Sequence, residues 1–194
     1  MINGKFSTSK VKYLYRAMDH INKVHNINIE KLPLDNSSLE SNVWLAGFTY
    51  ADGHFQINLQ GNYSLNKSLH LKRGRVKCTF SIKQRVIDKP TRDSCVPFMT
   101  QLANLFKCEI KYARENEMTF LTQADSKHHL TKSYFDKYPL LTSKWFDCLC
   151  FLQGLNYLGK GLTNKEIHEV QKIKSSMNRG RVNFNWEHLN NLKI

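Results

Sequence analysis

The chain contains 194 residues, of which 41% are hydrophobic. This length and composition suit one domain with a proper core and exclude a disordered tail, and no stretch is apolar for long enough to cross a bilayer. Lysine and arginine number 29 against 16 aspartate and glutamate residues, which gives a formal net charge of +13. A soluble domain this basic favours a polyanionic partner, and we expect nucleic acid.

The five cysteines form no metal-binding pattern, because Cys148 and Cys150 have the wrong spacing for a CxxC pair. We expect all five thiols to be reduced and mostly buried, in a reducing compartment. Two other groups of metal-ligating residue types, His128–His129 and the turn acids Glu115 and Glu117, also lack metal-site spacing. We expect both groups at the surface.

Residues 1–41 predict an amphipathic helix followed by a linker. Apolar residues recur at helical spacing between about residues 9 and 25; they are Val11, Leu14, Tyr15, Met18, Ile21 and Val24. Four basic residues precede the first acid, which is also typical of an organelle transit peptide. We favour a retained helix.

The segment WLAGFTYADGHF, residues 44–55, predicts a second helix over about residues 42–51. Gly53 lies just past the last periodic residue, where glycine commonly ends a helix. Asp52, however, stands where the negative pole of the helix dipole disfavours a carboxylate. Its position therefore calls for a functional explanation.

Residues 42–178, which begin with this helix, are predicted to form an α+β domain. Strict alternation over His54–Gln60, and again over about residues 71–84, indicates two half-buried strands. A helix, a hairpin and further helices follow; their approximate ranges are 94–106, 108–122, 142–158 and 164–178, with a short helix before Tyr138. The order αββαββαα suggests a four-stranded antiparallel sheet with helices on one face. Residues 179–194 form a basic, polar tail.

The uncovered face of the first two strands carries amides, hydroxyls and cations, and no acid. Its residues are His54, Gln56, Asn58 and Gln60 on the first strand, and Arg75, Lys77, Thr79, Ser81 and Lys83 on the second. Asparagine and glutamine pair with adenine edges, and arginine and lysine pair with guanine or phosphate. We predict a nucleic-acid-binding face; the alternative is an ordinary solvated face in a chain rich in asparagine and lysine.

The nine residues Leu45–Gly53 resemble the motif of the LAGLIDADG homing endonucleases. Seven of the nine match the family name or its usual phenylalanine variant, and Thr49 and Tyr50 depart from it. The resemblance extends over further segments: Phe80–Gln84, Tyr134–Lys144 and Leu162–Asn178. The family's core order is αββαββα. Residues 1–43 resemble the stretch that joins the halves of double-motif members from organelle introns, which implies a mitochondrial matrix location.

The resemblance also implies a paired helix and a shared metal site. Val43, Gly47 and Ala51 form a stripe of small residues at i, i+4 spacing, along which two such helices would pack closely. Two carboxylates of the Asp52 type would then meet and repel each other. A divalent cation reverses that field, and Mg²⁺ suits oxygen ligands and phosphates.

Two further catalytic residues follow from the resemblance alone. Gln84 matches the position that orients water near the metal, and Lys144 matches the basic residue near the scissile phosphate. Their ordinary alternatives are a strand-end amide and a lysine at a helix start. Tyr50 stands where many family members carry aspartate, but the ligand Asp52 is kept.

The function implied is that of a site-specific, metal-dependent double-strand DNA endonuclease. One motif supplies half of a cleavage site. The chain would therefore act as a homodimer or together with a separately encoded first half. A third possibility is a decayed member of the family that binds nucleic acid without cutting it. The competing class is a non-catalytic RNA-binding protein, such as an intron maturase or a component of the mitochondrial ribosome. Net charge does not separate DNA from RNA.

Overall fold

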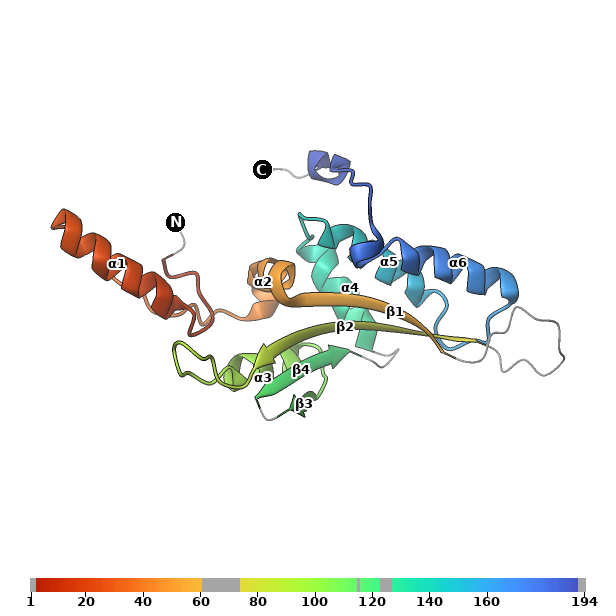
Figure 1. Cartoon of the computed structure of the whole chain (residues 1–194), viewed down its shortest axis with the longest axis horizontal. Coiled ribbons are helices and arrows are strands. Elements are labelled where there is room, and N and C mark those ends of the chain that lie inside the picture. The colour runs from red at the N-terminus through yellow and green to blue at the C-terminus, as the bar shows by residue number, and fades with distance from the viewer. Residues whose placement is uncertain (1–2, 61–73, 115, 123–126, 192–194) are drawn as a thin grey trace. The chain divides into compact units, whose positions relative to one another are not determined.

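The computed structural model describes residues 3–60, 74–114, 116–122 and 127–191 (Figure 1). Its helices are α1 (Val11–His25), α2 (Trp44–Asp52), α3 (Val96–Leu105), α4 (His128–Lys137), α5 (Lys144–Leu155) and α6 (Asn164–Ser175). Its strands are β1 (Gly53–Gln60), β2 (Arg75–Arg85), β3 (Ile110–Arg114) and β4 (Glu117–Thr122). Short 3-10 turns lie at Leu39–Ser41, Asn178–Gly180 and Glu187–Asn191.

The strands form one four-stranded sheet in the order β1-β2-β4-β3. The pairs β1–β2 and β3–β4 are antiparallel. This confirms the predicted α+β class and the motif helix followed by two hairpins. Residues 71–73 of the predicted second strand, and Glu115, lie outside the described residues.

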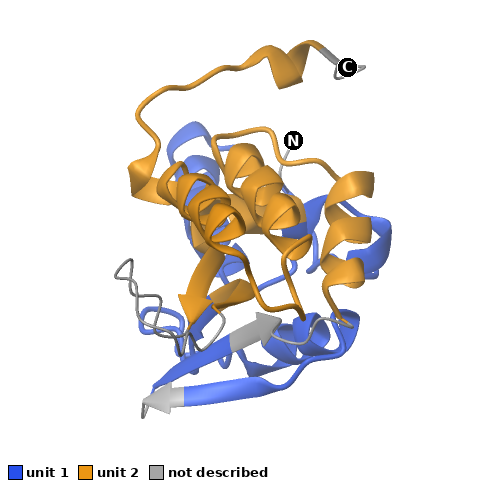
Figure 2. Ribbon diagram, turned by 90° about the vertical axis from the view of Figure 1, so that its right-hand side faces the viewer, with its two compact units in different colours: residues 1–45, 83–120 blue, residues 46–82, 121–194 orange. Residues whose placement is uncertain are grey.

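The chain divides into two compact units (Figure 2). The first unit comprises Met1–Leu45 and Lys83–Phe120, and the second comprises Ala46–Ile82 and Leu121–Ile194. Asp52, β1 and helices α4 to α6 belong to the second unit, so most of the expected site lies there.

Four phenylalanine rings form the centre of the second unit. Phe55 on β1 stacks against its cross-strand partner Phe80 on β2, with ring centroids 4.8 Å apart. Phe135 of α4 and Phe151 of α5 contact Phe55 at 5.5 and 5.4 Å. The period-2 pattern of β1 explains this core, because alternate residues of a strand point to the same face.

Gly154 brings α5 unusually close to the sheet. A Cβ atom there would lie 2.7 Å from Ile57 Cδ1 and 2.9 Å from Cys78 Sγ. Only glycine permits this approach without displacing its neighbours. The contact fixes α5 against β1 and β2, and α5 begins at Lys144.

The first unit contains α1, α3 and the β3–β4 hairpin. Lys12 on α1 forms a 2.7 Å ion pair with Asp93, and Trp44 meets the ring of Phe98 on α3 edge-on at 5.0 Å. The amphipathic helix prediction holds for the first half of α1, where Val11 and Met18 are buried. Its second half is exposed; Ile21 and Val24 there are exposed apolar residues.

The surface expectations for His128 and Glu117 were wrong, whereas His129 is exposed as expected. His128 is 2% exposed and meets the Phe151 ring edge-on, because helical periodicity places it on the inner face of α4 with Thr131 and Phe135. Glu117 belongs to β4 rather than to a solvated turn, and it forms a 2.8 Å ion pair with Lys83.

The expectation that the cysteines are mostly buried is confirmed. All five are free thiols, and three of them (Cys78, Cys148 and Cys150) are buried. Burial raises the pKa of the Cys148 thiol to about 12. That thiol is therefore a packing residue and no nucleophile at neutral pH.

Candidate functional site

Helix α2 passes directly into β1, with no loop between Asp52 and Gly53. Gly53 does not adopt the left-handed conformation of a common helix cap. Instead, a Cβ atom at Gly53 would lie 2.4 Å from Thr49 Cγ2 and 2.7 Å from the Thr49 carbonyl oxygen. Glycine is needed because the strand starts against the last helical turn, and the half-buried Asp52 is thereby held at the junction.

Lys144 reaches this junction from α5. Its Nζ donates a 2.7 Å hydrogen bond to the carbonyl oxygen of Gly53, the residue after Asp52. The structure thus brings two of the three expected catalytic residues to one place.

His54 is the next residue along β1, and its pKa reflects the same neighbourhood. The side chain of His54 is exposed, but partial desolvation of its ring lowers its pKa below 6.5, and the Lys144 cation lowers it further. The Asp147 carboxylate opposes both effects and raises it. The net effect on the pKa favours the neutral form of the imidazole.

Asp147 is a site-adjacent residue that sequence analysis missed. It lies one helical turn after Lys144, is 5% exposed, and accepts hydrogen bonds from Asn178 N at 2.8 Å and Arg181 Nη2 at 3.1 Å. The one clue in the sequence is an acid within an otherwise apolar helix. Nothing in the spacing identifies Arg181, 34 residues later, as its partner.

The predicted stripe of small residues lies along one exposed side of α2 and includes Val43, the residue before the helix. Val43 is 66% exposed and Ala51 is exposed. Apart from the backbone of α2 itself and the two chain neighbours, no atom of the described residues lies within 4 Å of where a Gly47 Cβ would stand. Tyr50 turns back to its own unit, where its hydroxyl accepts a 2.6 Å hydrogen bond from Leu141 N. The stripe therefore offers surface on which another helix could approach closely.

The sheet face carries most of the predicted polar side chains. Exposed are His54, Gln56, Gln60, Arg75 and Lys83; half-buried are Asn58, Lys77 and Ser81. The expectation of exposure is wrong for Thr79, which is 4% exposed, because its short side chain lies on the interior strand β2. Lys83 is partly neutralised by its ion pair with Glu117.

Gln84, the third expected catalytic residue, belongs to β2 and is half-buried. Gly53 pairs with Ile82, and Gln84 follows Ile82 by two residues along the strand.

Asp52 is the carboxylate that could hold a metal ion in this site. Among the described residues, no group of three or more histidine, cysteine, aspartate or glutamate side chains is arranged to hold a metal by itself. A single carboxylate at the end of an open helix face fits a metal only if further oxygen ligands come from elsewhere. Likewise, none of the described helices combines the length and apolarity needed to cross a membrane.

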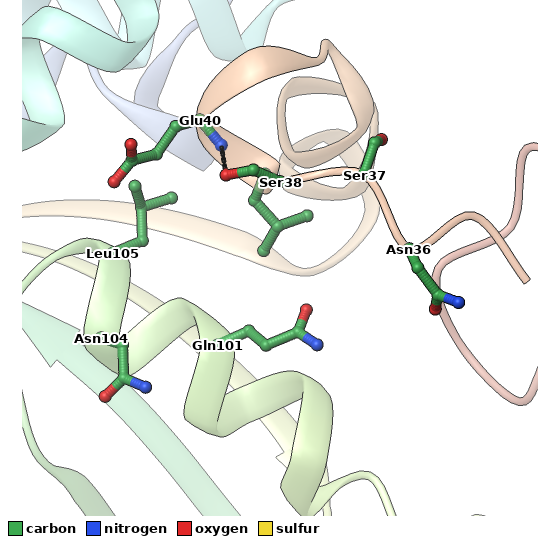
Figure 3. Close-up of a pocket in the computed structure, with 8 residues that line it drawn as sticks. Asn36, Ser37, Ser38, Glu40, Gln101, Asn104 and Leu105 are labelled. Atoms are coloured by element: carbon green, nitrogen blue, oxygen red, sulfur yellow. Dashed lines mark hydrogen bonds between the residues drawn. The ribbon is translucent and has the colours of Figure 1, made fainter.

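A separate hollow of about 410 Å³ lies in the first unit, between residues 36–40 and α3 (Figure 3). Its polar lining includes Glu40, Gln101 and Asn104. The backbone N–H of Glu40 donates to the Ser38 hydroxyl at 3.3 Å, which shapes one wall. The hollow holds one carboxylate, Glu40, and we assign it no chemistry.

Known proteins give the site its context. The profile of the LAGLIDADG endonuclease family matches residues 45–155, more than half of the chain. The chain is 28% identical over 227 aligned positions to the intron-encoded DNA endonuclease aI3 of Saccharomyces cerevisiae. That alignment covers 98% of this chain and 53% of the relative, so the chain spans about half of the relative's length.

Solved structures agree in fold. The homing endonuclease I-GzeII, in complex with its DNA target, matches with a TM-score of 0.56 and 25% identity over 77% of this chain and 48% of its own. I-LtrWI, bound to target DNA, matches with a TM-score of 0.60 at 19% identity over 84% and 53%. I-TnaI matches with a TM-score of 0.53 at 20% identity over 76% and 91%. With its motif helix, its sheet and a family profile over more than half of its residues, the chain belongs to the LAGLIDADG endonuclease family.

Proposed function

We propose that the protein is a site-specific, metal-dependent endonuclease that cuts double-stranded DNA together with a second LAGLIDADG domain. One observation carries the proposal. Asp52 ends a helix whose small-residue face is open, and Lys144 is hydrogen-bonded to the next residue, Gly53. A carboxylate and a cation at the end of a helix-pairing surface are half of a nuclease site.

A Mg²⁺ ion fits this arrangement if it is shared. Asp52 and its counterpart on the second domain would hold it, and their mutual repulsion would be relieved by its charge. When bound, such an ion lowers the pKa of water and stabilises the leaving oxygen of a phosphodiester.

The residues of this chain would supply positioning and charge. An ammonium group has three N–H donors, and Lys144 uses one of them on Gly53. The other two can bind a phosphate oxygen at the junction. Gln84 would orient the attacking water, because its amide both donates and accepts hydrogen bonds.

The second domain would be another copy of this chain or a separately encoded first half. This chain covers about half of aI3 and of I-GzeII, but its match spans 91% of I-TnaI. Both arrangements are therefore consistent with the lengths. The mass of the purified protein in dilute solution decides: a dimer supports the first arrangement, and a monomer supports the second.

DNA is the favoured substrate, since I-GzeII and I-LtrWI were solved with their DNA targets. The sheet face, from Gln56 to Lys83, would read the bases. The relative is an intron-encoded endonuclease, which supports a host intron for this chain as well. A location in the mitochondrial matrix rests on the resemblance of residues 1–43 to organelle intron members.

The test is cleavage of a duplex that carries the host gene's intron-insertion sequence, with Mg²⁺ or with a chelator. We expect the duplex to be cut only when Mg²⁺ is present. The control is a matched duplex in which the intron already separates the two halves of the site, and it should not be cut. If the protein, with any separately encoded first half present, cuts neither duplex but binds the intron RNA in high salt, it is an RNA-binding member of the family and the endonuclease proposal fails.

A further inference from the structure

The chain that follows α6 is tied to the first turn of α5 at two points within the second unit. At the first, the Arg181 guanidinium pairs with the Asp147 carboxylate at 3.1 Å and lies 4.9 Å over the Phe146 ring. At the second, the His188 ring stacks on Trp145, with centroids 6.0 Å apart and planes 16° apart. Two described residues of the tail predicted to be basic and polar, Arg181 and His188, are therefore packed against α5.

Between these points the chain exposes large apolar side chains. Val182, Phe184 and Trp186 are 82%, 53% and 48% exposed, and asparagines alternate with them. The rings of Phe184 and Trp186 are nearly parallel, with an 11° angle and centroids 6.2 Å apart, and Trp186 lies 6.1 Å from His188. Phe184, Trp186, His188 and Trp145 thus form one run of neighbouring rings, stacked in its two outer pairs and tilted by 33° between Trp186 and His188; we call this run the aromatic ladder.

The outer half of the aromatic ladder is too exposed to serve the core. Its inner half is less exposed: His188 and Trp145 are half-buried, and both ring nitrogens of His188 are buried. A flat ring placed on Phe184 or Trp186 would extend the stack with the offset geometry that aromatic rings prefer.

Nucleic-acid bases are flat rings of this kind. Arg179 is exposed at one end of the segment, and the amides of Asn183 and Asn185 are exposed between the rings, where they can bind base edges or phosphates. Bases within a duplex are already stacked on each other, so only unpaired bases can stack on a protein ring. The ligand that fits is single-stranded.

We infer that the aromatic ladder is a binding site for single-stranded nucleic acid, whose unpaired bases stack on Phe184 and Trp186. This site is distinct from the duplex-reading sheet face, and it goes beyond the proposed cleavage reaction.

The test measures binding of the full-length protein to fluorescein-labelled oligothymidylate and oligouridylate by anisotropy at one fixed salt concentration. Trp186→Ala and Phe184→Ala should each weaken binding by roughly 5- to 150-fold, the loss expected for one stacked base. Trp186→Phe keeps a ring and should restore most of the affinity. Loss with one oligonucleotide alone identifies the ligand as DNA or as RNA.

Tyr112→Ala is the matched control, because Tyr112 is an aromatic residue of the first unit that is 62% exposed. The Tyr112→Ala protein should bind both oligonucleotides as wild type does. All variants should keep the wild-type affinity for duplex DNA and a melting temperature within a few degrees of wild type. The inference is overturned if Trp186→Ala binds both oligonucleotides normally, or if single-strand and duplex affinities fall together. A Trp186→Ala protein with altered solution mass and unchanged oligonucleotide binding would also overturn it, and would assign the ladder to a protein contact.

Discussion

The Nζ of Lys144 donates a hydrogen bond of 2.7 Å to the carbonyl oxygen of Gly53, which joins the first residue of α5 to the first residue of β1. Because Asp52 immediately precedes Gly53, the bond holds a cation at the junction that carries the carboxylate. Gly154 keeps α5 close to the sheet, so the position of this cation is set by the core of the second unit.

Replacement of Lys144 by methionine should impair cleavage and spare the fold. Methionine keeps the apolar stem and removes the charge that would stabilise a phosphate in the transition state. We expect a loss of roughly 100- to 1000-fold in the cleavage rate, as for removal of one preorganised donor. Lys174→Met, at an exposed position on α6, is the control and should cut at the wild-type rate. Equal rates for the two variants would remove Lys144 from the site.

The pKa of His54 should respond to its two charged neighbours in opposite directions. Burial and the Lys144 cation lower it, and Asp147 raises it. Lys144→Met should therefore raise the pKa of His54 toward 6.5, while Asp147→Asn should lower it further. An NMR titration of the His54 ring measures both shifts. Shifts of the same sign in both variants would contradict the described neighbourhood.

Gly47→Ala should stabilise the isolated chain. Outside the nearby backbone of α2, nothing in the part of the chain that the structure describes lies within 4 Å of the added Cβ. Alanine in a helix is favoured over glycine by about 0.5–1 kcal/mol. Gly154→Ala is the contrasting control, since its Cβ would overlap Ile57 and Cys78 and overpacking costs about 1–3 kcal/mol. Urea unfolding of dilute protein measures both changes. A loss of stability in Gly47→Ala would mean that this face of α2 is occupied by the chain itself.

A bulkier residue at the same position should block assembly. Gly47→Leu leaves room for the monomer to fold but prevents close approach of a second helix backbone along the stripe. Sedimentation with the partner domain, or with a second copy, should show weaker association than for wild type. Unchanged association of Gly47→Leu would place the contact elsewhere.

Asp147 and Arg181 should contribute strongly to stability. Their side chains are 7% and 12% exposed, so Arg181→Met leaves a carboxylate buried without its cation. Removal of one member of a buried pair costs about 3–5 kcal/mol. The exposed pair of Lys132 and Asp136 on α4 is the comparison, and Lys132→Met should cost only about 0.3–0.5 kcal/mol. Similar costs for both variants, measured by urea unfolding, would refute the distinction.

Gln56 should determine base preference. Its side chain is exposed on β1, opposite Thr79. Gln56→Ala should relax discrimination at one base pair by about 1–3 kcal/mol, the value of a bidentate contact. Binding to a library of single-base target variants measures this, and Gln153→Ala, exposed on α5, should leave the profile unchanged. A uniform loss on every target would show that Gln56 does not read bases.

The features that depend on neighbouring residues in the sequence, such as strands and their buried faces, were predicted correctly. The alternation of Phe55 and Ile57 with polar residues identified β1 and its buried face. Gly53 was expected to end a helix, yet the reason is the close approach of Thr49, which only the folded junction creates.

Long-range relationships were beyond the sequence. Asp147 and Arg181 are 34 residues apart, and no periodicity connects a helix interior with a tail. Thr79 fits the alternating pattern of an outward-facing residue, yet it is buried because β2 is an interior strand of the sheet. The order of the strands in a sheet cannot be predicted from the alternation within one strand. Family resemblance placed Lys144 near the scissile phosphate, but its hydrogen bond to Gly53 was not predicted.

The most direct test of the account is cleavage by Asp52→Asn in Mg²⁺, with Asp136→Asn as a control that removes a carboxylate from the exposed side of α4. Both variants should bind the target duplex as wild type does. We predict that Asp136→Asn cuts at the wild-type rate and that Asp52→Asn does not cut. Metal-dependent cutting by Asp52→Asn at the wild-type rate would contradict the claim that this carboxylate is half of a shared nuclease site.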